Sequence, residues 1–549
     1  MSIYPHATMM TVAQWRQRLA QPDEGLAATL SRIYGADATL HDERLALMWR
    51  VIEAADTTLD PSIPCALIRV PGRINTMGIH TDTQYSWKNH VVFGREIVAL
   101  VQPRTDDVIS LHSPHQAYPD YSFGISDLLP DDERGSDWME VVEAAWDHVE
   151  VGAWQNYTIG PMLALQNHYS DRQLCGLDLV VDGDIPMAAG VSSSSALATL
   201  AGIAAIHFNQ LDIPMGEAIR VIGAGEWYCG SRGGPGDTGA QMLCRRGHVL
   251  HVKYDIPFDP YEEHHIPFPD DWRIVLCNTL VEARKSVGGR EKATARGLSQ
   301  VVGATLLREM FPEHAERIKC VADLTPENLG VPVSRIYEMF QALPIDCTNE
   351  LALKLAGSRA GELERPLRHW RIDQAEYPLR SPCMWTLCEP ARGARNRLAL
   401  ERRDEAEMRV LLQAAHDGDR IVRWLDDERG EPYDNTVSDD ALARLIHLAD
   451  SSDAAERESA QLYRQPGGFG CSCPELDLLV DICDGVDGVI GSRVTGAGMG
   501  GCMFAYAHRE AVPDLLRQVK ARYYERRGLP LAAWELLPSD RGGPLVLAD

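Results

Sequence analysis

The sequence lacks several features that would assign a function at once. No apolar run approaches the length needed to span a membrane, and the N-terminus has no basic start followed by an apolar core and a small-residue cleavage site. Thirteen cysteines are spread along the chain, but no pair has the two-residue separation of a zinc or redox site, and only Cys471 and Cys473 lie close together. We therefore predict a cytoplasmic protein with reduced thiols.

Positive charge is also scarce. The chain has 53 lysines and arginines against 79 aspartates and glutamates, a formal net charge of −26 at pH 7. An acidic protein is repelled at long range by nucleic acids and anionic membranes, so neither is expected as a partner. An anionic small molecule remains possible, because backbone amides at a helix N-terminus hold phosphate whatever the global charge. The sequence does not indicate an oligomeric state.

The 549 residues, 45% of them hydrophobic, allow two or three globular domains. Residues 1–60 predict a helical extension, because "DERLALMWRVIEAAD" carries apolar residues at helical spacing. Short β-branched runs alternate with helical patterns over 61–255, with a helix interruption expected near Gly160-Pro161. Residues 256–549 predict a second domain with a helical insertion and strands near 380–389, 486–491 and 502–507. The predicted fold class is α+β.

A small-residue turn with four serines is the most informative segment. In "DIPMAAGVSSSSAL", residues 184–197, a strand end leads through small residues into a long apolar helix. Small side chains let backbone N–H groups approach phosphate oxygens, and the helix dipole favours negative charge there. A linker or a simple N-cap is the alternative. Four consecutive serines between a strand and an apolar helix make a linker the weaker interpretation.

Two glycine-rich loops follow. In "GEWYCGSRGGPGDTGAQML", residues 225–243, a glycine-rich turn presents Asp237, a suitable position for a base. An isolated Gly-Pro-Gly-Asp is more often an ordinary surface turn that ends in an N-cap aspartate. The loop "GSRVTGAGMGGC", residues 491–502, enters an apolar strand and is weak evidence by itself.

Taken in chain order with "PGRINTMGIHTD", residues 71–82, these motifs resemble the signature set of the GHMP kinase superfamily and most resemble its galactokinase branch. The first galactokinase motif reads Pro-Gly-Arg-Val-Asn-Leu-Ile-Gly-Glu-His-Thr-Asp, and "CSCPELDLLVDI" resembles a further Ser-Cys-x-Glu-Leu-Asp segment. The resemblance spans about residues 62–507 and leaves the first 60 uncovered. It implies a two-domain GHMP kinase-like fold with the active site in the interdomain cleft.

The resemblance also implies a reaction, the ATP- and Mg²⁺-dependent phosphorylation of a galactose-like monosaccharide at its anomeric hydroxyl. Asp237 matches the catalytic base, Arg73 the arginine beside it, and Ser194 and Glu226 the magnesium ligands. The nucleotide phosphates are expected at a turn of seven residues: Ala189, Gly190, Val191, Ser192, Ser193, Ser194 and Ser195. The sugar and the cleft floor are expected at another seven: Ile79, His80, Asp82, Gly234, Gly236, Gly496 and Gly498.

Departures from the galactokinase pattern concentrate in the sugar half. Ile79 stands where the family has a glutamate that contacts the galactose hydroxymethyl group, and an unpaired buried hydroxyl costs about 1–3 kcal/mol. Thr83-Gln84 replaces Tyr-Asn, and a sugar-contacting tyrosine is missing near Lys292.

Two alternatives therefore stay open. One is a kinase for a sugar altered at carbon 6, L-arabinose or galacturonate, which would not need the missing glutamate. The other is a non-catalytic sugar-sensing regulator of the same fold. The retention of Asp237, Arg73, Glu226 and Ser194 speaks against the regulator.

Overall fold

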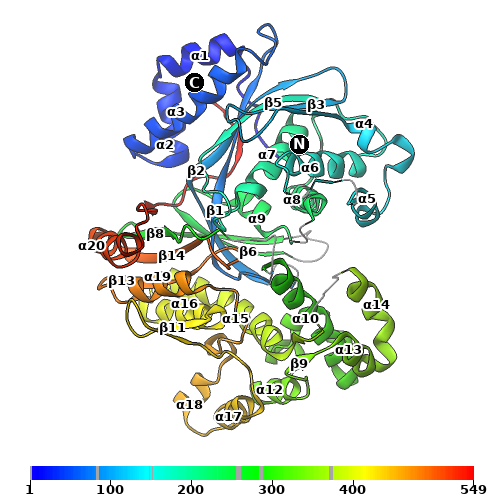
Figure 1. Cartoon of the computed structure of the whole chain (residues 1–549), viewed down its shortest axis with the longest axis vertical. Coiled ribbons are helices and arrows are strands. Elements are labelled where there is room, and N and C mark those ends of the chain that lie inside the picture. The colour runs from blue at the N-terminus through cyan, green and yellow to red at the C-terminus, as the bar shows by residue number, and fades with distance from the viewer. Residues whose placement is uncertain are drawn as a thin grey trace.

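Two mixed layers of sheet and helix organise the molecule (Figure 1). The computed structural model describes residues 3–548 apart from 82–83, 85, 147–148, 151, 231–232, 255–260, 283–288 and 370–374. Among these residues the larger sheet has eight strands and the second has four. Asp82, Thr83 and the predicted sugar contact that Asp82 makes lie outside the described residues.

The larger sheet is built around two long strands, β1 and β2. Its strand order is β16-β1-β2-β5-β3-β4, with β6 paired to β2 and β7 to β6. The strand β2 is long enough to pair with β5 through Ile97–Pro103 and with β6 through Trp87–His90. The bounds are β1 (Ala66–Met77), β2 (Trp87–Pro103), β3 (Val108–His112), β4 (Tyr121–Gly124), β5 (Leu177–Gly183), β6 (His248–Tyr254), β7 (Tyr261–Pro267) and β16 (Gly543–Pro544).

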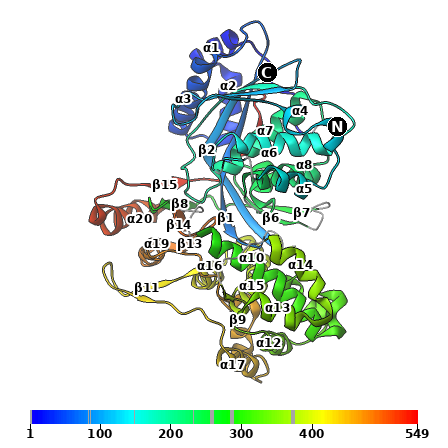
Figure 2. The same ribbon diagram turned by 45° about the vertical axis from the view of Figure 1, so that its right-hand side comes forward.

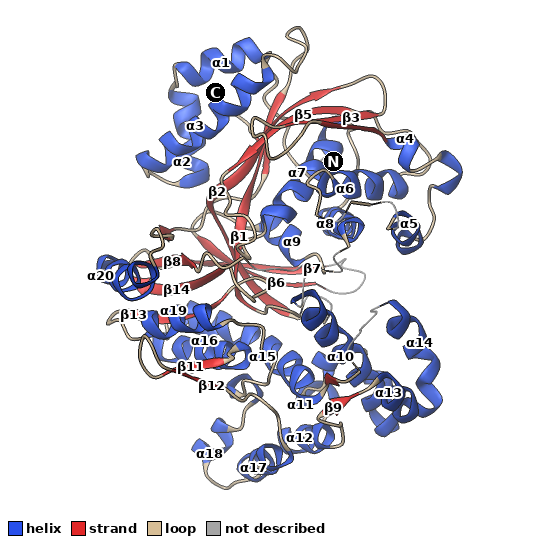
Figure 3. Cartoon of the chain, in the orientation of Figure 1, coloured by secondary structure: helices blue, strands red, loops and turns tan. Residues whose placement is uncertain are grey.

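Helices that follow these strands cover one face of the sheet: α4 (Ile125–Leu128), α5 (Trp138–Ala145), α6 (Asn156–His168), α7 (Ser193–Phe208), α8 (Met215–Gly225) and α9 (Gly236–Leu243) (Figure 3). The interruption predicted at Gly160-Pro161 is wrong, since α6 continues through Pro161. Gly160 packs directly on α8, where an added Cβ would lie 2.1 Å from the carbonyl oxygen of Gly225. The glycine thus marks a close helix–helix contact and not a break.

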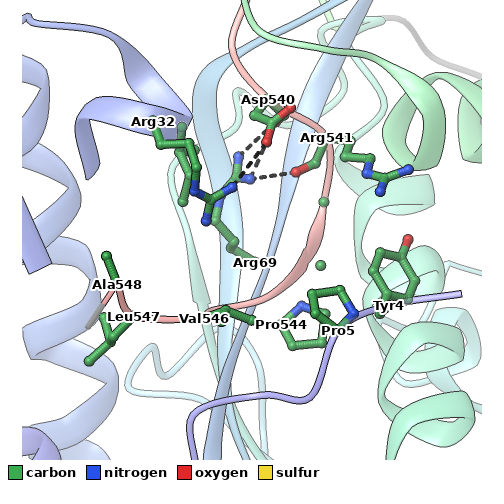
Figure 4. A pocket seen from close by; sticks show the side chains of 13 residues that line it. Tyr4, Pro5, Arg32, Arg69, Asp540, Arg541, Pro544, Val546, Leu547 and Ala548 are labelled. Carbon is green, nitrogen blue, oxygen red and sulfur yellow. Dashed lines mark hydrogen bonds and ion pairs between the residues drawn. The ribbon is translucent and has the colours of Figure 1, made fainter. Parts of the chain in front are cut away.

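The N-terminal extension is helical, as predicted, with α1 (Val12–Ala20), α2 (Glu24–Tyr34) and α3 (Ala38–Ala55). These helices pack on the sheet through a separate apolar cluster that includes Leu67, Val98 and Val180. The C-terminal tail runs between them and β1, where Leu545 N–H donates to the carbonyl of Leu67. A cavity of about 330 Å³ lies beside this tail. Figure 4 shows its lining residues, among them Arg69, whose guanidinium donates to the backbone carbonyls of Asp540 and Arg541.

The second sheet has the order β13-β14-β8-β15, and all its pairs are antiparallel. Its strands are β8 (Trp272–Asn278), β13 (Val489–Val494), β14 (Cys502–His508) and β15 (Ala533–Leu536), with α19 (Pro474–Asp484) and α20 (Val512–Val519) packed nearby. Strands occur where 486–491 and 502–507 were predicted. The expected boundary at 255 falls inside the first sheet, because β7 still pairs with β6 and β16 returns to β1.

The insertion forms a helical layer with its own apolar core, below the sheets in Figure 2. Its main helices are α10 (Gly289–Met310), α11 (Pro326–Leu329), α12 (Val333–Gln341), α13 (Asn349–Ala356), α14 (Ala360–His369), α15 (Arg380–Arg402), α16 (Glu405–Asp419), α17 (Asp439–Ala449) and α18 (Ala454–Ser459), and its short strands are β9 (Asp346–Cys347), β10 (Tyr377–Pro378), β11 (Val422–Trp424) and β12 (Gly430–Pro432). The strand predicted at 380–389 is wrong. It is the buried start of α15, and a short apolar run looks the same in a buried helix and a buried strand. No helix within the described residues is both long and apolar enough to cross a membrane.

Candidate active site

A buried ion pair joins β1 to the first turn of α9. Arg73 Nε lies 2.6 Å from Asp237 Oδ1, and Arg73 Nη2 lies 2.7 Å from Asp237 Oδ2. The third guanidinium nitrogen, Nη1, donates to the carbonyl of Gly190 at 2.7 Å. The Asp237 side chain keeps 24% of its exposure, whereas Arg73 keeps 6%. The bidentate pair therefore holds a fixed carboxylate at the edge of solvent.

The serine turn wraps this carboxylate. Ser192 Oγ donates to Asp237 Oδ2, and Ser195 Oγ lies 3.4 Å from the same oxygen. Ser195 Oγ also lies 3.0 Å from Glu226 Oε2. Ser193 begins α7, so the free N–H groups and positive dipole end of a 16-residue helix stand next to these acids.

The late glycine loop packs against the back of the serine turn. An added Cβ at Gly496 would lie 2.0 Å from the carbonyl oxygen of Gly190, and one at Gly501 would lie 2.5 Å from the carbonyl carbon of Ala189. The N–H of Cys502 donates to the Ala189 carbonyl at 2.9 Å. The structure thus brings Gly190 and Gly496 together through backbone contact that any larger residue would block.

The other three glycines predicted to line the site are Gly498, Gly236 and Gly234. Gly498 packs on the Cys471 backbone, where a Cβ would meet the carbonyl oxygen at 2.2 Å. Gly236 is the buried first residue of α9, and Gly234 is half-buried just before it. Gly234 and Gly236 therefore shape the turn that presents Asp237, and Gly498 shapes the glycine loop of residues 491–502. Their contact with a sugar stays a prediction.

The oxygen atoms near Asp237 fit a magnesium ion. Hydroxyl and carboxylate oxygens are the ligands that Mg²⁺ prefers, and Ser195 and Glu226 already converge. The predicted ligand Ser194 is placed differently, since its hydroxyl interacts with Tyr157, whereas the Ser195 hydroxyl lies against Glu226 and Asp237. On this geometry Ser195, one residue further along α7, is the serine that would accompany Glu226.

The predicted sugar-binding residue His80 lies in a loop, Gly78–Thr81, that we call the His80 loop. The backbone of His80 itself has a φ of 58°, in the left-handed region. The imidazole stacks on Phe469 with ring centroids 4.3 Å apart, and its Nε2 lies 3.0 Å from Cys471 Sγ. Burial, with the cations Arg493 and Lys88, lowers the pKa of His80 to about 3. The ring is therefore neutral at pH 7.

Ile79 does not occupy the position expected for it. Its side chain is fully buried in the apolar cluster of the second domain, with Phe469, Leu476, Val494 and Met503 among the other members. An isoleucine gains by leaving water, and here its side chain packs into that cluster. The expectation that Ile79 presents a methyl surface to the sugar is corrected by this placement.

Sequence reasoning missed the residues that surround His80 and Asp237. Asp419 and Cys471 lie close enough to His80 for the three to share a metal ion. The Arg493 guanidinium 3.5 Å from Asp419 disfavours a cation there, and the cysteine Sγ lies within hydrogen-bond distance of both partners, 3.0 Å from Asp419 Oδ1. Lys88 was also missed, and no local pattern marks it, because Asn89 and His90 follow it directly in β2. Burial lowers its pKa to about 7, against the opposing effect of Asp237.

Comparisons with known proteins show which family the chain resembles. Residues 156–245 match the family described as GHMP kinases N terminal domain, and residues 440–525 match GHMP kinases C terminal. The galactokinase of Dictyostelium discoideum is 24% identical over 84% of this chain and 85% of its own, and that of Roseiflexus sp. (strain RS-1) is 22% identical over 88% and 94%. A solved structure of Lactococcus lactis galactokinase complexed with galactose superposes with a TM-score of 0.60 at 19% identity, covering 90% of this chain and 99% of that one. The last likeness shows the fold.

Proposed function

Because the chain belongs to the GHMP kinases, within which it resembles the galactokinases, we propose that it transfers the γ-phosphoryl group of ATP to the anomeric hydroxyl of a galactose-like monosaccharide. The observation that carries the proposal is the bidentate Arg73–Asp237 pair at the N-terminus of α7. A carboxylate fixed beside an anion-binding helix end is what a kinase needs to hold its acceptor hydroxyl near the transferred group.

Each group has a defined task in this reaction. Asp237 accepts the proton of the sugar hydroxyl as the hydroxyl oxygen attacks phosphorus, and Arg73 keeps the carboxylate ionised and oriented. The N–H groups at the start of α7 and the small residues of the serine turn face the nucleotide phosphates. Ser195 and Glu226 would hold Mg²⁺, which supplies neutralisation of the phosphate charge.

Galactose is the first sugar to test. The case for L-arabinose or galacturonate depended on Ile79 facing carbon 6, and the burial of that side chain removes the argument. A non-catalytic regulator would not need an ordered base, and the Asp237 carboxylate is held by Arg73 and two serine hydroxyls.

The test is a panel of free monosaccharides with ATP and Mg²⁺, in which ADP release is measured and the phosphate is located by ³¹P and ¹H NMR. We expect galactose to give a sugar 1-phosphate. The Asp237→Asn protein, purified in parallel, controls for contaminating kinases. If no sugar releases ADP above that control, the proposed function is wrong.

A further inference from the structure

The His80 loop is held from outside its own domain, by helices of the insertion. Gly78 N–H donates to Glu389 Oε1 of α15 at 2.8 Å, and the His80 carbonyl accepts from Gln300 Nε2 of α10 at 3.1 Å. The two contacts bracket the loop at a backbone donor and a backbone acceptor. The insertion, for which the sequence suggested no purpose, thus reaches the proposed sugar subsite.

Glu389 is a fully buried carboxylate whose charge is balanced on both sides. Arg493 Nη1 lies 2.7 Å from its Oε1, and Arg392 Nε lies 2.7 Å from its Oε2. Burial alone would raise the pKa of Glu389, but the two arginines lower it to about 2. Glu389 is therefore an ionised acceptor throughout the working pH range, and hydrogen bonds to ionised groups are stronger than neutral ones.

The loop needs such support. His80 has a left-handed backbone, which a residue with a side chain keeps only where its surroundings hold it. Gly78 packs closely on β2 and leaves no room for a side chain, because an added Cβ would lie 2.7 Å from the Trp87 carbonyl oxygen. Lys88 Nζ and Thr81 Oγ1 both donate to the Gly78 carbonyl, at 3.1 and 2.9 Å. Gly78 is thus held at both its N–H and its carbonyl, and Glu389 supplies the contact from the second domain.

We propose that Glu389 and Gln300 are positioning residues that hold the His80 loop in the geometry in which it binds the sugar. Both Glu389 oxygens are occupied by protein donors, so its effect on the sugar passes through the loop. The inference rests on the proposed function for the identity of the ligand. Its structural part, the dependence of the loop on α10 and α15, stands without it.

The first experiment compares Glu389→Gln with Glu96→Gln. Glu96 is an equally buried carboxylate that pairs with Arg69 and Tyr34. Its replacement should therefore lower the stability of the protein about as much as Glu389→Gln does, without touching the His80 loop. We expect Glu389→Gln to raise the KM for the sugar about tenfold or more and to leave the KM for ATP within about twofold. Glu96→Gln should lower the Tm and leave both KM values alone. An unchanged sugar KM in Glu389→Gln, or an equal rise in both variants, overturns the inference.

A second pair of variants keeps the test usable if Glu389→Gln does not fold. Gln300→Met removes the donor to the His80 carbonyl, and Gln102→Met removes a matched buried amide that donates to Asp60 and Ile63. Hydrogen exchange of the peptide covering the His80 loop is measured without substrates. We expect faster exchange in Gln300→Met and Glu389→Gln, and wild-type exchange in the Gln102→Met control.

The readouts separate the two proposals. Unchanged exchange in both insertion variants overturns the positioning role whatever the kinase assay shows. Faster exchange with no sugar phosphorylated by any of the proteins confirms the support of the loop and refutes the proposed function alone.

Discussion

Replacement of Asp237 by asparagine tests the core of the proposed chemistry. The amide keeps the shape of the carboxylate but cannot take a proton from the sugar hydroxyl. It also turns an N–H₂ group toward one of the two Arg73 nitrogens that now donate at 2.6 and 2.7 Å. Loss of a positioned base lowers turnover by about 10²–10⁴-fold. The ATP affinity should change little, since the serine turn stays in place.

The same substitution has a computable cost in stability. Removing one partner of a buried ion pair costs about 3–5 kcal/mol. The Asp237 side chain is 24% exposed, so solvent screens part of the lost charge, and the discounted cost is about 2 kcal/mol. Asp184 offers a matched control, because it is 22% exposed, pairs with the buried Arg44 through both carboxylate oxygens, and precedes the turn of residues 189–195 without being part of it.

The assay is steady-state kinetics with ATP binding and thermal unfolding measured on the same preparations. Asp184→Asn should lose similar stability and keep its kcat, while Asp237→Asn loses kcat at saturating sugar and ATP. Turnover of Asp237→Asn within about tenfold of wild type would refute the assignment of the base. A loss of equal size in Asp184→Asn would show that stability and not chemistry had been measured.

Three further predictions concern the metal, the apolar side of the loop and pH. Glu226→Gln and Ser195→Ala should each raise the Mg²⁺ concentration for half-maximal activity more than Ser194→Ala does, and the opposite order in a Mg²⁺ titration would restore Ser194 as the ligand. Ile79→Ala should lower the free energy of unfolding by about 2–5 kcal/mol in urea titrations, because it opens a cavity in a closed core, whereas a loss below about 0.5 kcal/mol would contradict its burial. The pKa of His80 is lowered in the folded protein, so its contribution to stability is present above pH 6.5 and is lost as pH falls toward 3, by up to about 1.4 kcal/mol per pH unit. The free energy of unfolding, measured by denaturant titration at pH values from 7 to 4, should fall less steeply with falling pH in His80→Gln than in the wild type. An identical pH dependence in the two proteins would refute the buried neutral ring.

The parts of the site that depend on local motifs could be predicted from the sequence. Arg73 lies in β1 and Asp237 in the first turn of α9, and the two meet as the resemblance of their motifs implies. The sequence could not show which serine would bind the metal together with Glu226. Successive residues of a helix point about 100° apart, so an error of one residue exchanges Ser194 for Ser195. Ile79 was misread for a related reason, since only the tertiary fold decides which side of a loop is core.

The fold shows the same division. Short runs rich in apolar residues, such as 66–70 in β1 and 177–181 in β5, lie in strands where the pattern predicts them. The start of α15 was mistaken for a strand because both of its sides are buried and no periodicity remains. Glu389 is 311 positions from Gly78 in the chain, and Gln300 is 220 positions from His80. No local sequence pattern encodes contacts over such separations.

The tail that lies along β1 also bears on how the protein is made. Ala548 N–H donates to Thr29 Oγ1, a partner 519 positions earlier in the chain, and β16 covers the free edge of β1. At about 5–20 residues per second, the ribosome needs on the order of 25–100 s to produce the intervening chain. Throughout that time the edge of β1 and the helix that carries Thr29 are exposed to chaperones and proteases. The helix that carries Thr29 and the edge of β1 therefore gain these contacts only after a segment about 500 residues further along the chain has been made.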